Sequence, residues 1–350
     1  MDLKIYNDPH VIPQLAAQWH ALLAKFYHEN IFYTPGYINA WYEAYGSHAT
    51  QIICIYETPG NALLIAPLVT CADGWLRIAG YKRGDYNAII FDKTEPTVFL
   101  YLIKWIITHK LKVEFSNEHE LNRTHDLLPS PFRHNSNRWF KFLVSKYLGT
   151  VPFTTVKTSK DCPYIPNSNR EDIISHITES RTHQQRIKII KKLGLIQYGR
   201  TYEKPRIAEL LPALFEMHIK QWDANNGKSL FLEQANKTFY HLLLQHVPPG
   251  RIRLDTLSLG QRILSMHLGF EDDLYVYYYK PCYDIAYRKH SPGAILLNHI
   301  IIQTMNSGKH FDFLKGMEAY KSDYTDAIQT VHQIKTQPSM LLRFLPNLYA

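Results

Sequence analysis

The sequence lacks the short motifs that mark the commonest nucleotide- and metal-dependent enzymes. It has no Gly-rich dinucleotide fingerprint, no Walker phosphate loop, no Gly-x-Ser-x-Gly elbow and no His-Glu-x-x-His zinc motif. The four cysteines, Cys54, Cys71, Cys162 and Cys282, are far apart and form no Cys-x-x-Cys pair. This spacing indicates neither a zinc site nor a disulfide framework, so we expect no metal and a reduced, cytoplasmic setting.

Targeting signals and long apolar runs are missing as well. The first residues, Met-Asp-Leu-Lys, lack the apolar core of a signal peptide. The longest apolar stretch, residues 99–107, contains Lys104 and is about half the length needed to cross a bilayer. We therefore expect no membrane span.

The composition is that of a folded protein. Hydrophobic residues make up 45% of the 350 residues, with 24 Tyr and 16 Phe, which is enough apolar material for two domains of ordinary size. The formal net charge is +8. Because the basic residues are spread along the chain apart from one cluster at 181–194, this charge points only weakly to an anionic partner.

The order of predicted elements recurs in the two halves, although no residue-level repeat is visible. Strands joined by short turns, together with one helical crossover in each half, predict an α/β protein of the α+β type with mixed sheets. The expected helices are residues 11–27, 36–45, 96–109, 171–193, 205–225, 234–246 and 292–307. The expected strands are residues 51–57, 62–70, 75–80, 86–91, 111–117, 195–203, 251–258, 261–271, 274–280 and 309–314.

Two tandem domains of one fold are the interpretation of this recurrence. The stretch 149–169 contains three prolines and many Ser, Thr and Asn residues, which is typical of a linker. We therefore predict domains at residues 1–160 and 161–350.

The most informative segment runs from 274 to 321 and reads as strand, turn, helix, strand. Ser291 is a preferred N-cap, Pro292 fits the first helical position, and the helix N-terminus should lie at the C-terminal edge of the preceding strand. Free amides and the helix dipole favour a phosphate there. The segment predicts a site for a pyrophosphate-bearing cofactor, although a well-capped core helix fits the same pattern. Its residues would be Arg288, Lys289, Ser291, Gly293 and Ala294.

Chemistry is expected at the end of the last strand. Asp312 lies between Phe311 and Phe313, and a buried carboxylate there would have a raised pKa and could act as a base. The alternative is a structural acceptor for the following loop. That loop carries Glu318, Tyr320 and Lys321, which could supply a base, an acid and an anion clamp, or form a surface salt bridge.

Two histidines are candidates for the acceptor pocket. His218 and Trp222 are four residues apart, hence on one helix face, and His267 lies inside a strand. Each could contact substrate, and core packing is the alternative for each. The basic helix at 181–194 is either a solvated amphipathic face or a surface for an anionic substrate.

Several of these blocks resemble a known family. The run His290-Ser-Pro-Gly-Ala294, then Gly308, then Phe311 to Lys321, is similar to the C-terminal signature of the CelD/BcsL-type acetyltransferases of the GNAT superfamily. The likeness is strongest over residues 160–325. The chain differs from ordinary GNAT enzymes in that His290 to Ala294 replaces the arginine- or glutamine-led, glycine-rich pyrophosphate loop.

The resemblance implies tandem GNAT-like domains related to the FemABX transferases. It further implies acetyl-CoA or another acyl-CoA as co-substrate, bound by the second domain. A small-molecule or saccharide acceptor with an amine or hydroxyl is expected. Two alternatives stay open: a FemABX-like transferase that uses aminoacyl-tRNA, and a non-catalytic binding module.

Overall fold

The computed structural model describes residues 1–28, 30–46, 49–95, 97–119 and 153–338. Contacts divide the chain into two units. Unit 1 contains Met1–Lys160 and the C-terminal segment from Thr330, and unit 2 is Asp161–Gln329. The second domain was expected to run to residue 350. In the structure the chain instead returns to unit 1, because its last described strand pairs with a strand of that unit.

Unit 1 contains a sheet in the order β1-β2-β3-β4-β6-β13, with β5 paired to β3. All its pairs are antiparallel except β4 with β6. The strands are β1 (Asp2–Tyr6), β2 (Ala49–Thr58), β3 (Asn61–Thr70), β4 (Trp75–Ile78), β5 (Ile90–Phe91), β6 (Lys112–His119) and β13 (Ile328–Pro338). The helices are α1 (Ile12–Phe26), α2 (Pro35–Tyr45) and α3 (Thr97–Thr108).

Unit 2 contains a sheet in the order β7-β12-β11-β10-β9-β8, in which only the pair β11 and β12 is parallel. The expected mixed sheets are thus confirmed. The strands are β7 (Phe153–Ile165), β8 (Ile196–Thr201), β9 (Ile252–Leu259), β10 (Arg262–Glu271), β11 (Tyr275–Tyr283) and β12 (His310–Asp312). The helices are α6 (Arg170–Glu179), α7 (Arg181–Lys191), α8 (Lys204–Asp223), α9 (Gln234–His246) and α10 (Pro292–Asn306).

Three parts of the expected element order differ from the structure. The single helix at 171–193 is two helices, because Ser180 leaves the helical conformation, with ψ 114°, and its hydroxyl accepts a hydrogen bond from the His183 amide, which starts α7. The expected strand at 86–91 is limited to Ile90–Phe91, which pair with Leu64 and Ile65 of β3. The expected linker contains β7, whose Thr-rich sequence favours strand.

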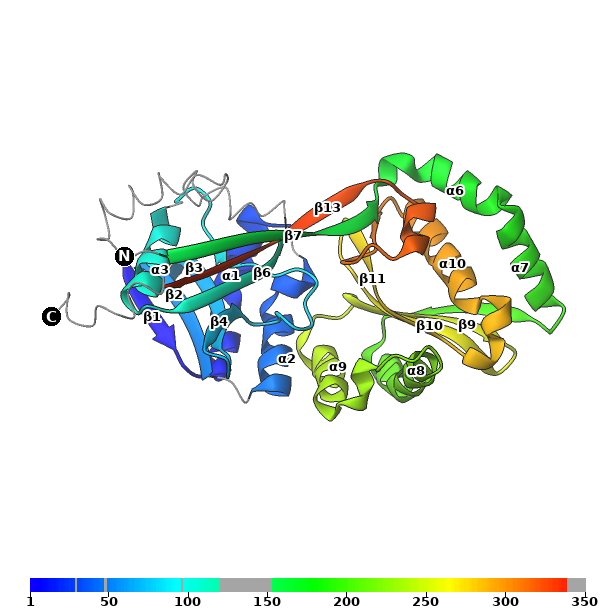
Figure 1. Cartoon of the computed structure of the whole chain (residues 1–350), viewed down its shortest axis with the longest axis horizontal. Coiled ribbons are helices and arrows are strands. Elements are labelled where there is room, and N and C mark those ends of the chain that lie inside the picture. Colours follow the sequence, from blue (N-terminus) through cyan, green and yellow to red (C-terminus); the bar gives the residue numbers. More distant parts are fainter. Residues whose placement is uncertain (29, 47–48, 96, 120–152, 339–350) are drawn as a thin grey trace. The chain divides into compact units, whose positions relative to one another are not determined.

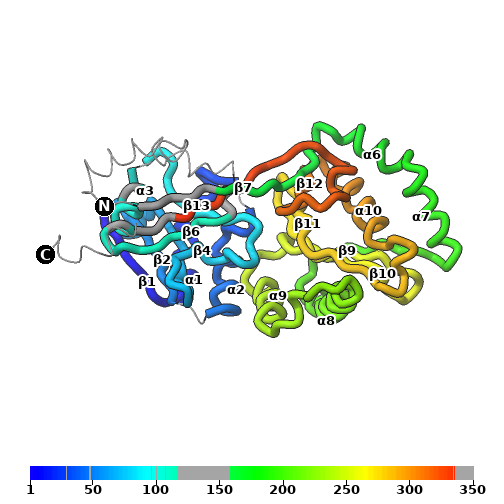
Figure 2. Tube along the Cα trace, in the orientation of Figure 1, coloured from blue at the N-terminus to red at the C-terminus, as the bar shows by residue number. Residues whose placement is uncertain are grey.

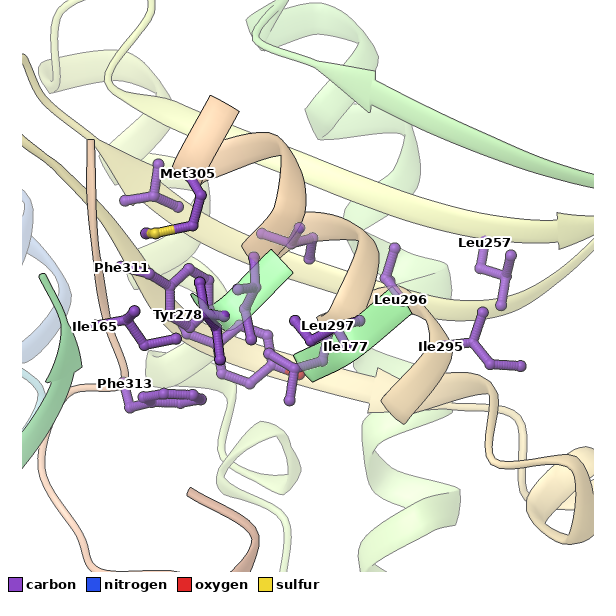
Figure 3. Packing of buried hydrophobic residues seen from close by; sticks show 14 of the residues in the cluster. Ile165, Ile177, Leu257, Tyr278, Ile295, Leu296, Leu297, Met305, Phe311 and Phe313 are labelled. Atoms are coloured by element: carbon purple, nitrogen blue, oxygen red, sulfur yellow. The ribbon is translucent and has the colours of Figure 1, made fainter. Parts of the chain in front are cut away.

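The core of unit 2 forms around α10. In Figure 1, α8 and α9 lie on one face of the sheet and α10 lies on the other. Helix α10 is apolar on most of its surface, as expected of a helix buried on several sides. Figure 3 shows Ile295 of this helix beside Leu257 of the sheet, and Tyr278 and Phe311 of the sheet belong to the same buried cluster. This packing fixes the start of α10 beside the end of β11.

Candidate functional site

Strands β11 and β12 separate after a short parallel pairing. Tyr275 to Tyr277 pair with His310 to Asp312, and β11 then continues to Tyr283 while β12 ends. The two strands lie side by side in Figure 2. After β12 the chain follows β7 instead, because the Phe313 amide donates to the Pro163 carbonyl at 3.0 Å. The edge of β11 from Tyr278 onward thereby diverges from β12.

A β-bulge in β11 lies at this divergence. The register between β10 and β11 shifts between Leu268 and Phe270, so β11 has one residue more than β10 there. The Tyr279 amide donates to Nε2 of His267 at 3.1 Å, and Nδ1 of the same ring lies 3.2 Å from Asp255. Because Nε2 accepts a hydrogen bond, the neutral ring carries its proton on Nδ1 and donates to Asp255.

This arrangement corrects the expectation that His267 contacts substrate. Its side chain is fully buried, and its ring stacks on Tyr278 with 4.5 Å between ring centroids. Burial lowers the pKa of His267, and the hydrogen bond with Asp255 only partly opposes this effect. His267 is therefore a neutral support for the bulge. Gly269 is required beside it, since a Cβ there would lie 2.3 Å from the His267 ring.

Asp255 belongs to a buried group of charges that the sequence interpretation missed. Its carboxylate accepts from Arg253 at 2.7 Å and from Arg200 at 2.9 Å. Burial opposes ionisation of Asp255, but Arg253 and His267 outweigh it and hold its pKa below the ordinary value. Arg253 also reaches Glu271, which binds Lys309 at 2.6 Å. The sequence did contain a signal for this group, because Arg253 and Asp255 stand among the apolar residues of β9.

The N-terminus of α10 differs in one respect from the expectation. Ser291 adopts a left-handed conformation, with φ 51° and ψ 49°, and its side chain caps no amide. The reason is that Ser291 also ends the short helix Ile285–His290, where its own amide donates to the Arg288 carbonyl. The first backbone bond of α10 joins the Ile295 amide to the Ser291 carbonyl. The amides of Gly293 and Ala294 precede that bond.

The surroundings of these amides are basic. Arg288 and Lys289 are exposed and lie directly before the helix, as expected. A Cβ on Gly293 would touch the Tyr283 ring at 3.4 Å, so the backbone lies close to the end of β11. The helix dipole and the two cations make this end of α10 electropositive.

Tyr283 contacts both this helix terminus and α8. This role was not predicted from the sequence. Its ring faces Gly293, and its amide donates to the Gln221 side chain at 2.9 Å. Gln221 stands next to Trp222, whose side chain is 44% exposed. The end of α8, the end of β11 and the start of α10 thus meet around one residue.

His218 is buried rather than open to substrate. Its Nδ1 lies 2.8 Å from the Ser229 hydroxyl, and its ring stacks on Trp222 with 5.5 Å between centroids. Burial, and secondarily the charge of Lys280, lower its pKa to about 4. His218 is therefore neutral at physiological pH, and its ring packs against the buried side of Trp222.

Asp312 is buried, as expected, and its carboxylate accepts from the Leu314 amide at 2.7 Å. This bond supports Leu314 in a left-handed conformation with φ 61°. The structure therefore gives Asp312 the structural role that was one of the two alternatives.

The loop after β12 brings the remaining catalytic candidates together. Lys321 is buried, and its ammonium donates to the carbonyls of Phe313, Lys315 and Gly316 and pairs with Glu318 at 2.7 Å. These bonds correct its expected role as an anion clamp. The Glu318 side chain remains 57% exposed. Partial burial, and then the charge of Glu318, raise the pKa of Tyr320, so its hydroxyl keeps its proton.

Tyr320 lies on the β11 side of this loop. Its ring contacts Phe313 edge to face, and Phe313 contacts Tyr278 in the same way. The structure thus gathers Glu318, Tyr320 and the diverging edge of β11 in one region, while His218 and Trp222 lie near the C-terminal end of β11.

Comparisons with known proteins agree with this architecture. Residues 181–322 match the family model described as an acetyltransferase (GNAT) domain. The structure of FemX has a TM-score of 0.59 and 10% identity, over 96% of this chain and 97% of that one. No curated protein matches the sequence.

Two further solved structures cover nearly the whole chain. A Bacteroides thetaiotaomicron protein of unknown function has a TM-score of 0.55 and 9% identity, over 97% of this chain and all of that one. The C-terminal domain of a putative lysylphosphatidylglycerol synthetase from Agrobacterium fabrum has a TM-score of 0.55 and 8% identity, over 93% of this chain and 92% of that one.

The fold is tandem GNAT-like. At these identities the solved structures establish the fold alone. The predicted fold class is therefore confirmed, and the resemblance noted in the sequence is supported over residues 181–322, which match the model of an acetyltransferase (GNAT) domain.

Two features are absent from the residues that the structure describes. No helix among them is long and apolar enough to cross a bilayer. No group of three or more His, Cys, Asp or Glu side chains in that part is arranged to hold a metal ion.

The first prediction concerns the pH dependence contributed by His218. Its pKa is about 4 in the folded GNAT domain and 6.5 ordinarily, so the unfolded state binds more protons between these values. The free energy of unfolding should therefore fall as pH drops from about 6.5 toward 4, by up to about 3 kcal/mol from this residue. Urea unfolding of wild type and His218→Gln at several pH values measures the difference. If both proteins lose stability equally over this range, His218 is not the buried neutral group described.

A second prediction concerns the support of the bulge in the GNAT domain. His267→Ala leaves the buried Tyr279 amide without its acceptor and opens a cavity beside Tyr278. We expect a loss of about 3 kcal/mol in the free energy of unfolding, measured by urea denaturation. His267→Gln, whose amide oxygen can accept the bond, should recover part of it. His176→Ala, at an exposed position on α6, should cost less than about 0.5 kcal/mol. An equally small cost for His267→Ala would contradict the assignment.

Proposed function

We propose that unit 2 is an acyl-CoA-dependent acyltransferase, with acetyl-CoA as the first choice of donor. The observation that carries this proposal is the separation of β11 and β12 beside the uncapped N-terminus of α10. The match of residues 181–322 to a family described as acetyltransferases supports it. We place the acceptor in the class of saccharides or amino-acid derivatives that carry an amine or a hydroxyl.

The start of α10 has the chemistry that a diphosphate requires. The amides of Gly293 and Ala294 come before the first backbone bond of the helix, and the left-handed Ser291 turns the backbone into the helix. Arg288 and Lys289 add two exposed cations. Amides at a helix N-terminus together with nearby cations form a standard anion site. Ser291 contributes to this site through its backbone, since its side chain makes no cap.

The bulge of β11 supplies a donor for the acyl carbonyl. The Leu274 carbonyl accepts from the His310 amide, so residue 274 faces β12, whereas the Tyr279 amide faces His267 on β10. Alternate residues of a strand direct their backbone groups to the same edge. The Tyr278 amide therefore faces the opening, where it would stabilise the negative charge that develops on the carbonyl oxygen.

Proton transfer is assigned to the loop after β12. The acceptor nitrogen or oxygen forms a bond to the acyl carbon, the carbon–sulfur bond breaks, and one proton moves from acceptor to thiolate. Glu318 is the proposed base, because its carboxylate is exposed, and Tyr320, which keeps its proton, is the proposed acid. Asp312 positions this loop through the Leu314 amide. Trp222 is the proposed wall of the acceptor site.

The third prediction tests donor binding. Acetyl-CoA should raise the midpoint of thermal unfolding of the wild-type protein, because it binds the folded state. Gly293→Ala should still fold, since its Cβ makes only an ordinary contact with Tyr283. The added methyl group obstructs the approach to the amides and should weaken binding ten- to a hundred-fold, roughly the value of one charge-assisted hydrogen bond.

Calorimetry of matched variants refines this test. Arg288→Ala should weaken acetyl-CoA binding, whereas Lys228→Ala, an exposed cation on the loop after α8, should not. Absence of any thermal shift or heat with acetyl-CoA at saturating concentration would overturn the acyltransferase proposal.

The fourth prediction tests whether Glu318 and Tyr320 transfer the proton, in contrast to another side chain of the same loop. With an acceptor in hand, Glu318→Gln and Tyr320→Phe should each lower kcat about a hundred-fold or more while KM for acetyl-CoA changes little. Asp323→Asn, which removes a carboxylate from the same loop, is the matched control and should keep kcat. Full turnover in both Glu318→Gln and Tyr320→Phe would show that other groups transfer the proton.

A further inference from the structure

The surface of α7 and the turn after it carries one sign of charge. Residues 180–202 contain no Asp or Glu, while α7 and its end hold five basic residues: Arg181, Arg186, Lys188, Lys191 and Lys192. The three lysines are exposed. In the part of the chain that the structure describes, no carboxylate forms an ion pair with them. The acyltransferase site proposed above uses none of them.

Large apolar side chains are exposed among these lysines. Ile190 is fully buried against the core, but Ile189 is 41% exposed, Leu193 49% and Leu195 72%. Ile189 lies in the last turn of α7, whereas Leu193 and Leu195 lie in the turn that follows the helix. Ile190 therefore packs on the core, while the end of α7 and the turn after it carry an apolar strip that is directed to solvent.

The apolar strip continues into a hollow at the junction of α7 and β8. A cavity of about 620 Å³ there is lined by Ile187, Lys191, Gly194, Leu195, Ile196 and Tyr198. Its lining is apolar apart from Lys191, which stands at the rim of the lysine group. Figure 1 shows α7 on the outer side of α10, with its end beside the start of β8.

From this combination we propose that the α7 surface docks on an anionic lipid bilayer. The term α7 surface means Lys188, Ile189, Lys192, Leu193 and Leu195 together with the hollow. Cations beside exposed aliphatic side chains suit phosphate headgroups above an acyl layer, into which such side chains insert by a few ångström. Soluble anions would account for the lysines but leave the exposed leucines without a partner.

Nucleic acid fits the same charges less well. Sequence-tolerant binding of single strands uses aromatic rings that are free to stack on bases. Tyr198, which lines the hollow, is already stacked on His299 with 3.9 Å between ring centroids. The aliphatic residues Ile189, Leu193 and Leu195 supply no comparable stacking surface. The bilayer is therefore the occupant that the side chains favour.

The fifth prediction is tested by sedimentation of the full chain with vesicles. Wild-type protein should sediment with phosphatidylcholine vesicles that contain phosphatidylglycerol and not with phosphatidylcholine alone, and added salt should weaken the association. Lys188→Gln with Lys192→Gln should lower the partition coefficient roughly twenty- to thirty-fold, about five-fold for each lysine. Ile189→Ser with Leu195→Ser should lower it about tenfold without changing charge.

Matched controls lie elsewhere on unit 2. Leu232→Ser removes a side chain that is 60% exposed, and Lys228→Gln removes an exposed cation. Both should bind vesicles like wild type, and far-ultraviolet circular dichroism checks that every variant is folded. The proposal is overturned if these controls weaken binding as much as the α7 variants do. It is equally overturned if the protein does not sediment with anionic vesicles. This outcome holds whether or not the protein binds transfer RNA in a parallel assay.

Discussion

The architecture of unit 2 depends on how buried backbone amides are satisfied where β11 and β12 separate. A strand that loses its neighbour inside a protein leaves donors that need other acceptors. After β12 the amides of Phe313 and Gly316 donate to carbonyls of β7, while the extra amide of the β11 bulge donates to His267. The carboxylate of Asp312 satisfies the Leu314 amide. Because these four amides have partners within the protein, the two strands can separate in the folded state without leaving them unsatisfied.

The same region contains charges that an apolar core would ordinarily exclude. Arg253 is almost fully buried, and it lies between Asp255 and Glu271. Removing one partner from such a group leaves an uncompensated buried charge, whereas the complete group is close to neutral in its effect on stability. Since Asp255 also fixes the tautomer of His267, these charges determine the orientation of the ring that supports the bulge. The buried charges and the backbone of β11 are thus coupled.

The sequence predicted the features that depend on local periodicity. The apolar pattern and its end at Gly308 located α10 within one or two residues. Strands joined by short turns are antiparallel and strands joined by a helical crossover are parallel, so the presence of both connections predicted the mixed sheet. Features that depend on distant partners were not predictable. Strand β13 pairs with β6, and β7 pairs with β12, across separations of more than a hundred residues. The side chain of His267 was assigned to substrate because nothing local shows that Asp255 and Tyr279 occupy both ring nitrogens.

The place of β13 in the chain has a consequence for how the protein is made. Strand β6 of unit 1 acquires this neighbour only from residues at the very end of the described sequence, after all of unit 2 has been synthesised. Domains ordinarily fold in order as they leave the ribosome. Here the N-terminal unit gains the β13 neighbour of β6 last, so this edge of β6 cannot pair with β13 until unit 2 has been translated. Translation of residues 161–329 therefore separates the synthesis of β6 from that of its partner strand β13.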